Sequence, residues 1–264
     1  MNMVLLEPGQ IAGGGAVALD ARQSAHVAGV LRSSPGDSIR VGELGGMVGR
    51  AEVLEVSSSG VILAHPELDR EPPRPWFDLM LAMPRPKVMR RLWAPLASLG
   101  ARHIILTNAA KVEGDYFGNH WLDPAAYVPL LKEGLEQSGA TALPQVEIVK
   151  RLRPFVEDVV PIRFANATKL LAHPDEEGKG GDDRNDRSDR SDRNDKSDGE
   201  DGNCGNVKCR GEALPLLAVG PEGGWTPFEL DMLERSGFRR FSLGSRPLRT
   251  DVAIAALCGA MMAV

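Results

Sequence analysis

The chain has 264 residues, of which 42% are apolar and 25% charged, a composition that supports two ordinary globular domains. It contains no apolar run of the roughly 18 residues that a membrane span requires, and its opening residues do not resemble a secretory signal. Three cysteines, Cys204, Cys209 and Cys258, are too few for a disulfide framework and unsuitably spaced for zinc, so we expect a reducing compartment and no metal.

The formal net charge of −5 belongs to one segment. Residues 175–212 contain 13 acidic and 8 basic residues, so the rest of the chain carries 36 − 13 = 23 acidic and 31 − 8 = 23 basic residues. The segment repeats Asp-Arg with Asn and Ser and has almost no apolar residue, so it cannot bury enough surface to offset its ordering entropy. We predict a disordered acidic insertion; its Arg triplets could bind RNA or a partner, but the excess of aspartate argues against this.

The first seventy residues contain short β-like runs at 38–46, 49–56 and 60–68, separated by turn signals. SAHVAGVLR, at 24–32, has apolar residues at helical spacing, which predicts one short helix. The proline-rich stretch DREPPRPW then favours a break. The sequence therefore predicts a small barrel or sandwich over 1–72 and a second domain over 73–264.

After the break the pattern alternates between buried strands and helices. We expect strands at 77–84, 101–108, 143–150, 168–174, 214–224 and 239–244, and helices at 87–100, 127–139, 153–163, 226–238 and 249–264. The helix at 226–238 has Thr226 as a cap, Pro227 in its first turn, Glu229 to complete a capping box and Gly237 to stop it. This alternation predicts an α/β domain with a mostly parallel sheet covered by helices.

Three of the predicted strands end in small or backbone-restricting residues: LLAHP, LAVGPEGG and FSLGSRPLRT. In open α/β sheets, ligands bind at the carboxyl ends of the strands, and glycines let a ligand approach the backbone closely. Glu222 in the second turn would repel phosphate, so a flat, hydrogen-bonding ligand such as adenine fits better than a phosphate group. The alternative that these glycines and prolines only make turns stays open.

Charged residues lie beside these strand ends. Arg249, just before an apolar helix, would bring a fixed cation to the pocket mouth, or else form an ion pair with Asp251. A second basic cluster follows the first strand of the large domain and could neutralise phosphates or simply form a solvated helix surface. Its members are Arg85, Lys87, Arg90 and Arg91.

Several stretches, in this order and spacing, resemble the SPOUT RNA methyltransferases, and within them the enzymes that methylate N3 of uridine 1498 in 16S ribosomal RNA. The stretches are HVAGVLR followed by PGD, MPRPKVMRRL, LEQSGATALP, LLAHP, AVGPEGGWTPFEL and SLGSRPLRTDVAIAAL. The resemblance covers nearly the whole chain outside the acidic insertion.

The resemblance implies a PUA-like RNA-binding barrel followed by an α/β domain whose last segments form a trefoil knot that binds S-adenosylmethionine. It also implies a homodimer, with the apolar C-terminal helix as a candidate interface. The implied cofactor-binding residues are Leu171, His173, Pro174, Gly220, Glu222, Gly223, Gly224, Leu243, Gly244, Leu248 and Thr250. The RNA-binding residues that we predict are Arg32, Arg85, Lys87, Arg90 and Arg91.

Arg249 is our candidate catalytic residue: beside the uracil carbonyls it would stabilise the anion that forms when N3 loses its proton. Two departures from the family pattern, Asp251-Val252 in RTDVA and Ala140 in EQSGATALP, weaken the transfer of RNA-contacting detail. They leave two alternatives: another SPOUT methylation site, or a non-catalytic RNA-binding ribosome-assembly factor. The expected location is the bacterial cytoplasm, with an organelle that has bacterial-type ribosomes left open.

Overall fold

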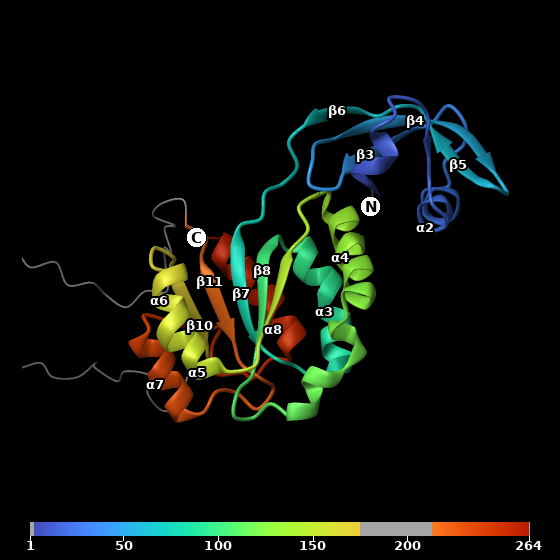
Figure 1. The fold of residues 1–264 in the computed structure, drawn as a ribbon. Coiled ribbons are helices and arrows are strands. Elements are labelled where there is room, and N and C mark those ends of the chain that lie inside the picture. Colours follow the sequence, from blue (N-terminus) through green and yellow to red (C-terminus); the bar gives the residue numbers. More distant parts are fainter. Residues whose placement is uncertain (1–2, 175–212, 264) are drawn as a thin grey trace, which may run out of the picture.

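The computed structural model describes residues 3–174 and 213–263 and confirms the α/β class (Figure 1). It contains two sheets of six strands each, one in each half of the chain. The predicted acidic insertion over 175–212, with Cys204 and Cys209, lies outside the described residues. Its disorder therefore stays a prediction.

The first sheet has the order β1-β3-β4-β5-β2, with β6 paired to β4. Only β1 and β3 run parallel among these pairs, and the others are antiparallel. The strands are β1 (Val4–Leu6), β2 (Val17–Ala18), β3 (Ser38–Glu43), β4 (Val48–Ser57), β5 (Gly60–Leu63) and β6 (Glu67–Arg70). The three predicted β runs are thus present, although the third divides into β5 and β6.

The sequence missed β1, β2 and the one-turn helix α1 (Pro8–Ile11), because runs of two to four residues are too short to establish a period. The predicted helix at 24–32 corresponds to α2 (Ala21–Ala25), which continues as a π-helical turn, η1 (His26–Leu31). Asp20 caps α2 by accepting a hydrogen bond from the Gln23 backbone N–H.

The second sheet is parallel throughout, with the order β12-β10-β11-β7-β8-β9. Its strands are β7 (Phe77–Ala82), β8 (Ala101–Thr107), β9 (Gln145–Val149), β10 (Lys169–Ala172), β11 (Leu216–Val219) and β12 (Arg239–Phe241). Each corresponds to a predicted strand. The prediction of a parallel sheet is confirmed.

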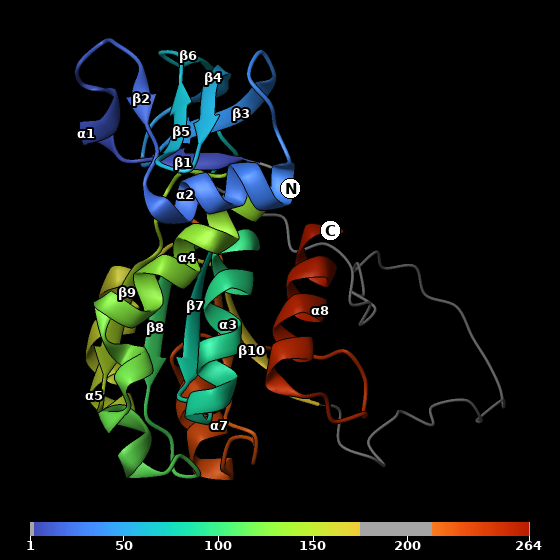
Figure 2. The same cartoon turned by 90° about the vertical axis from the view of Figure 1, so that its right-hand side faces the viewer.

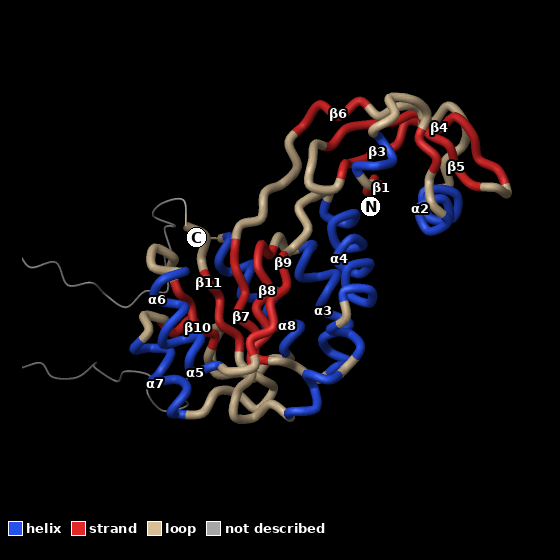
Figure 3. The backbone as a smooth tube through the Cα atoms, viewed as in Figure 1, coloured by secondary structure: helices blue, strands red, loops and turns tan. Residues whose placement is uncertain are grey.

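Helices cover both faces of this sheet (Figure 3). Alternate residues of β7 point to opposite sides, so Leu79 and Leu81 pack toward α3, α4 and α8, whereas Met80 and Ala82 pack toward the shorter helices and α7. The bounds are α3 (Pro86–Ser98), η2 (Gly114–Gly118), η3 (His120–Leu122), α4 (Pro124–Ser138), α5 (Leu152–Pro154), η4 (Phe155–Val159), α6 (Val160–Arg163), α7 (Pro227–Arg235) and α8 (Thr250–Met262).

The prediction of one continuous α-helix at 153–163 is wrong. The structure has two short α-helices there, α5 and α6, with a π-helical segment, η4, between them. Pro161 has no backbone N–H, so it cannot continue the ordinary hydrogen-bond ladder. The backbone N–H of Val160 instead donates to the carbonyl of Phe155, five residues earlier.

The two halves of the chain meet at the amino ends of the parallel strands (Figure 2). β7 begins after segment 71–76, which contains the expected domain boundary between 72 and 73. Met3 and Leu5 of the N-terminal half are buried in the same apolar cluster as Leu131 and Leu135 of α4. The halves therefore share part of a core. In the described part of the chain, no helix is long and apolar enough to cross a membrane.

Candidate functional site

A cavity of about 470 Å³ lies at the carboxyl ends of β10, β11 and β12. Its walls come from residues 172–174, 219–225, 243–244, 246–248 and 250, with Lys111 on one side and the first turns of α8 on another. The volume lies within the range of small-molecule sites. The three strand ends that the sequence analysis grouped together thus form one pocket, at the edge of the sheet away from the N-terminal half.

Glycine is required in the two turns that shape this pocket. Gly224 has φ +70° and donates its backbone N–H to the carbonyl of Pro221 at 2.8 Å, which closes the turn after β11. Gly244, in the turn after β12, has φ +102°. A side chain at Gly220 would place its Cβ 3.0 Å from Nε1 of Trp225, so this glycine lets the strand end lie against the indole.

Ten of the eleven residues implied as cofactor-binding line this cavity: His173, Pro174, Gly220, Glu222, Gly223, Gly224, Leu243, Gly244, Leu248 and Thr250. Leu171 does not line it. Its side chain is fully buried in the core between the sheet and α7. The structure thus brings together residues separated by the whole acidic insertion.

Three further residues line the pocket and were not predicted from the sequence: Lys111, Trp225 and Arg246. The Lys111 ammonium donates to the carbonyl of Gly223 at 2.6 Å. Lys111 follows the carboxyl end of β8, so the same strand-end argument could have found it. Trp225 is buried, and within the described ranges its Nε1 has no hydrogen-bond partner.

Two carboxylates hold the wall after β11 to neighbouring elements. Glu222 Oε1 accepts a hydrogen bond from the backbone N–H of Arg85 at 3.2 Å. Glu229 Oε1, buried at the start of α7, accepts one from the backbone N–H of Ala110 at 2.7 Å. Among the described residues that line the cavity, Glu222 is the one carboxylate, and Lys111 and Arg246 are the two basic residues.

Arg249 lies beside the pocket and does not line it. It precedes α8 as its N-cap residue, and its side chain is 68% exposed. Its guanidinium lies 3.2 Å from Oδ2 of Asp251, and Arg91 lies 3.5 Å from the same oxygen. The ion pair with Asp251 considered from the sequence is therefore present, and the next residue, Thr250, contacts the cavity.

The basic residues predicted to bind RNA fall into two groups. Arg85, Lys87, Arg90 and Arg91 are exposed at the start of α3 beside the pocket, and the Arg90 guanidinium lies 4.9 Å from the ring centroid of Trp121. Arg32 instead follows η1 in the N-terminal half, at the other end of the parallel strands. Among described residues, no group of three His, Cys, Asp or Glu side chains could hold a metal ion.

The fold and the pocket define the class of this protein: an α/β protein with a small-molecule site at three strand ends. Comparison with family models then shows to which family of this class the chain belongs. Residues 70–262 match the model of the RNA methyltransferase domain. This match spans more than half of the chain, so the chain belongs to that family.

Relatives with curated names agree with this assignment. The chain is 28% identical over its full length to ribosomal RNA small subunit methyltransferase E of Treponema pallidum, covering 91% of that protein. It is 23% identical, over 66% of its length and 62% of the relative, to ribosomal RNA small subunit methyltransferase E 1 of Borreliella burgdorferi.

Two solved structures have the same fold. A ribosomal RNA small subunit methyltransferase E from Neisseria gonorrhoeae, bound to S-adenosylmethionine, has a TM-score of 0.69 at 22% identity, covering 100% of this chain and 97% of that one. A Legionella pneumophila methyltransferase in complex with the same cofactor has a TM-score of 0.65 at 19% identity, covering 100% and 98%.

Proposed function

We propose that the protein transfers a methyl group from S-adenosylmethionine to N3 of a uridine of the position-1498 type in 16S ribosomal RNA. The observation that carries this proposal is the cavity built jointly by the ends of β10, β11 and β12 in a chain of the RNA methyltransferase family. The small-subunit specificity rests on the names of the relatives from Treponema pallidum and Neisseria gonorrhoeae.

The cavity suits the proposed cofactor. Apolar side chains such as Leu243, Leu248 and Leu257 would cover a flat base, while the exposed backbone of the glycine turns would pair with its edge. The Glu222 carboxylate would attract a cationic sulfonium, and Lys111 and Arg246 line the same cavity. When bound, S-adenosylmethionine supplies the methyl group, and the residues around the cavity hold and orient it.

Methyl transfer to N3 of uracil needs a base that is free of pairing and loses its N3 proton, so positioning and charge stabilisation are the protein's main contributions. Arg249 is the proposed source of that stabilisation, because its exposed guanidinium stands at the pocket rim beside Thr250. Arg91 shares Asp251 with it, so Asp251 would hold the two cations in place.

The RNA would lie over the start of α3. Four basic residues are exposed there and would neutralise phosphates near the target base: Arg85, Lys87, Arg90 and Arg91. The Arg85 backbone contacts Glu222 of the cavity wall, and Arg91 shares Asp251 with Arg249. The N-terminal half, which carries Arg32, would add a second contact as a PUA-like barrel.

We also propose a homodimer through α8. Val252 and Met262 are 50% and 58% exposed, and Ala255, Ala256 and Gly259 are exposed between them. These residues recur at helical spacing and form one apolar stripe next to the pocket. The proposal includes a trefoil knot formed by the segments that build the pocket, and a cytoplasmic site of action.

Mapping modified bases in ribosomal RNA tests this function. Small-subunit RNA from cells lacking the protein is compared with wild-type RNA, and both are incubated with purified protein and labelled S-adenosylmethionine. We expect N3-methyluridine at the 1498-type position to be absent from the deletion strain and restored in vitro. An unchanged N3-methyluridine would contradict the site, and label at another base would indicate a different RNA methylation.

A further inference from the structure

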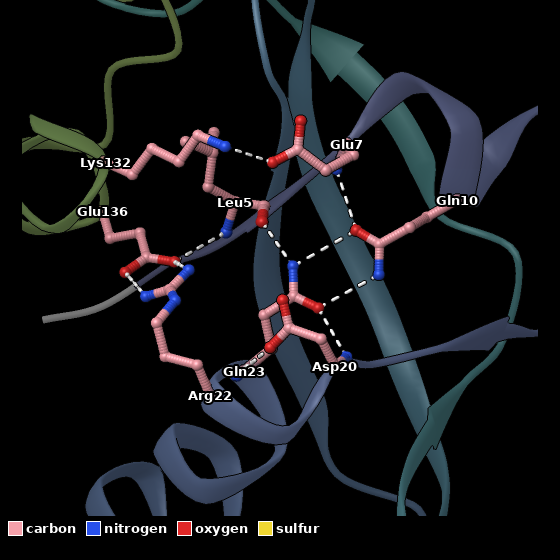
Figure 4. A network of polar contacts seen from close by, with 8 residues as sticks. All are labelled: Leu5, Glu7, Gln10, Asp20, Arg22, Gln23, Lys132 and Glu136. Carbon is pink, nitrogen blue, oxygen red and sulfur yellow. Dashed lines mark hydrogen bonds and ion pairs between the residues drawn. The ribbon is translucent and has the colours of Figure 1, made fainter. Parts of the chain in front are cut away.

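The N-terminal half is joined to α4 by a polar network that the proposed chemistry does not use (Figure 4). Glu136 of α4 is 5% exposed and accepts three hydrogen bonds from the N-terminal half. Arg22 of α2 donates two of them, at 2.8 and 2.9 Å, and the backbone N–H of Leu5 in β1 donates the third, at 3.3 Å. A second ion pair joins Lys132 of α4 to Glu7.

Within the N-terminal half, the partners of Glu136 are fixed to one another. The side-chain amide of Gln23 donates to the carbonyl of Leu5 at 2.7 Å and to Gln10 Oε1 at 3.2 Å, while its own oxygen accepts from the backbone N–H of Asp20 at 2.8 Å. Gln23 is 2% exposed. The helix that carries Arg22 is therefore hydrogen-bonded to strand β1, and Glu136 binds both of these elements.

The geometry of this network is suited to fixing the orientation of the N-terminal half relative to α4. The apolar contact beneath it, made by Met3 and Leu5 against α4, is non-directional. A bidentate pair between a guanidinium and a carboxylate fixes both distance and angle. Burying a carboxylate costs free energy that offsets much of the attraction within the pair, so such a pair is weak evidence for stability, and its best-attested use is to select one arrangement.

We propose that Arg22 and Glu136 are positioning residues for the RNA substrate, because they hold the N-terminal half in one orientation on the methyltransferase domain. The inference rests on the proposed function in one respect, that the substrate is an RNA long enough to contact both halves. Such an RNA binds a preformed two-part surface in the wild-type protein. Without the pair, only the fraction of molecules in the correct orientation binds it, and the apparent affinity falls by that fraction.

The test uses the full chain and Glu136→Gln, which keeps the size of the side chain and an oxygen for the Leu5 N–H but removes the charge. We expect affinity for a 16S ribosomal RNA fragment to fall about five- to tenfold. The S-adenosylmethionine affinity and the turnover at saturating RNA should stay within about twofold, since the cofactor pocket lies at the opposite edge of the sheet. Arg22→Gln should reproduce the loss, and Arg22→Lys should recover part of it.

Distances between spin labels on the two halves give a readout that does not depend on RNA. Labels at Leu54→Cys and Ile162→Cys, both exposed, are placed in a chain with Cys204→Ser and Cys209→Ser and diluted with unlabelled protein. Wild type should give a narrow distance distribution and Glu136→Gln a broad one. The matched control is Glu157→Gln, which removes an exposed ion pair with Arg153 inside the methyltransferase domain and should change no readout.

A narrow distribution in Glu136→Gln, or a broad one with unchanged RNA affinity, would overturn the inference. If the wild-type protein binds the RNA fragment but transfers no methyl group, the proposed function fails. The RNA affinities and the label distances still test whether Arg22 and Glu136 orient the N-terminal half. If the wild-type protein does not bind the RNA, both proposals fail.

Discussion

At the scale of single residues, Arg249 carries the most specific chemical prediction. Its guanidinium is exposed at the pocket rim and paired with Asp251 rather than directed into the cavity. Replacing it by alanine should reduce the methylation rate about 10²-fold, the typical cost of removing one donor that stabilises a developing anion. The cofactor affinity, measured by calorimetry, should not change.

Arg235→Ala is the control for Arg249→Ala, because Arg235 is an exposed arginine of α7 paired with Asp231. It should methylate at the wild-type rate. A near-normal rate for Arg249→Ala would remove Arg249 from the mechanism.

The burial of Cys258 predicts how the reactivity of its thiol depends on pH. The residue is fully buried in α8, and burial raises the pKa of its thiol to about 12. A thiol reacts as its thiolate, which forms only as the pH rises toward that value, so at pH 8 the thiolate fraction is on the order of 10⁻⁴. Peptide-resolved mass spectrometry after iodoacetamide treatment of the folded protein should find Cys258 unmodified. Rapid modification at pH 8 would contradict the packing of α8.

At the scale of elements, the start of α7 joins local sequence to the pocket wall. Thr226 Oγ1 accepts from the backbone N–H of Glu229 at 3.3 Å, and Glu229 Oε2 accepts from the Thr226 backbone N–H at 2.8 Å. The capping box was predicted from sequence alone. Sequence gave no sign that Glu229 also binds the backbone of Ala110, because that contact spans 119 positions.

This difference predicts unequal effects on stability. Thr226→Ala should lower the free energy of unfolding by about 1 kcal/mol, the usual cost of a lost cap. Glu229→Ala should cost more, by about 1–3 kcal/mol further, because the N–H groups of Thr226 and Ala110 both lose a partner. Urea denaturation measures both values, and equal losses would contradict the role of Glu229 as a link between β8 and α7.

The elements that were predicted well from the sequence are long apolar or periodic runs, or runs whose ends carry capping residues. The buried strands β7 and β8 and the capped helix α7 belong to this group. The short N-terminal strands and the π-helical turn η4 were missed because their conformations depend on partners far along the chain, or on one proline. The pocket was predictable as three strand ends, whereas Lys111, from a fourth strand end, was overlooked.

At the scale of the whole molecule, the apolar stripe on α8 predicts self-association. Replacing both Val252 and Met262 by glutamate places charges on the stripe and should convert a dimer into a monomer, as measured by sedimentation velocity. Ile162→Glu is the control, because Ile162 is 82% exposed on α6, apart from the stripe. A wild-type protein that sediments as a monomer would contradict the proposed dimer.

The central claim is that the cavity at the ends of β10, β11 and β12 binds S-adenosylmethionine. Calorimetric titration of the cofactor tests it most directly, with Ala253→Phe to fill the cavity and Ala125→Phe, on the exposed first turn of α4, as the matched control. We predict that wild type and Ala125→Phe bind equally and that Ala253→Phe binds at least about tenfold more weakly, because the added ring occupies the site. No binding by the wild-type protein, or equal binding by Ala253→Phe, would contradict the claim.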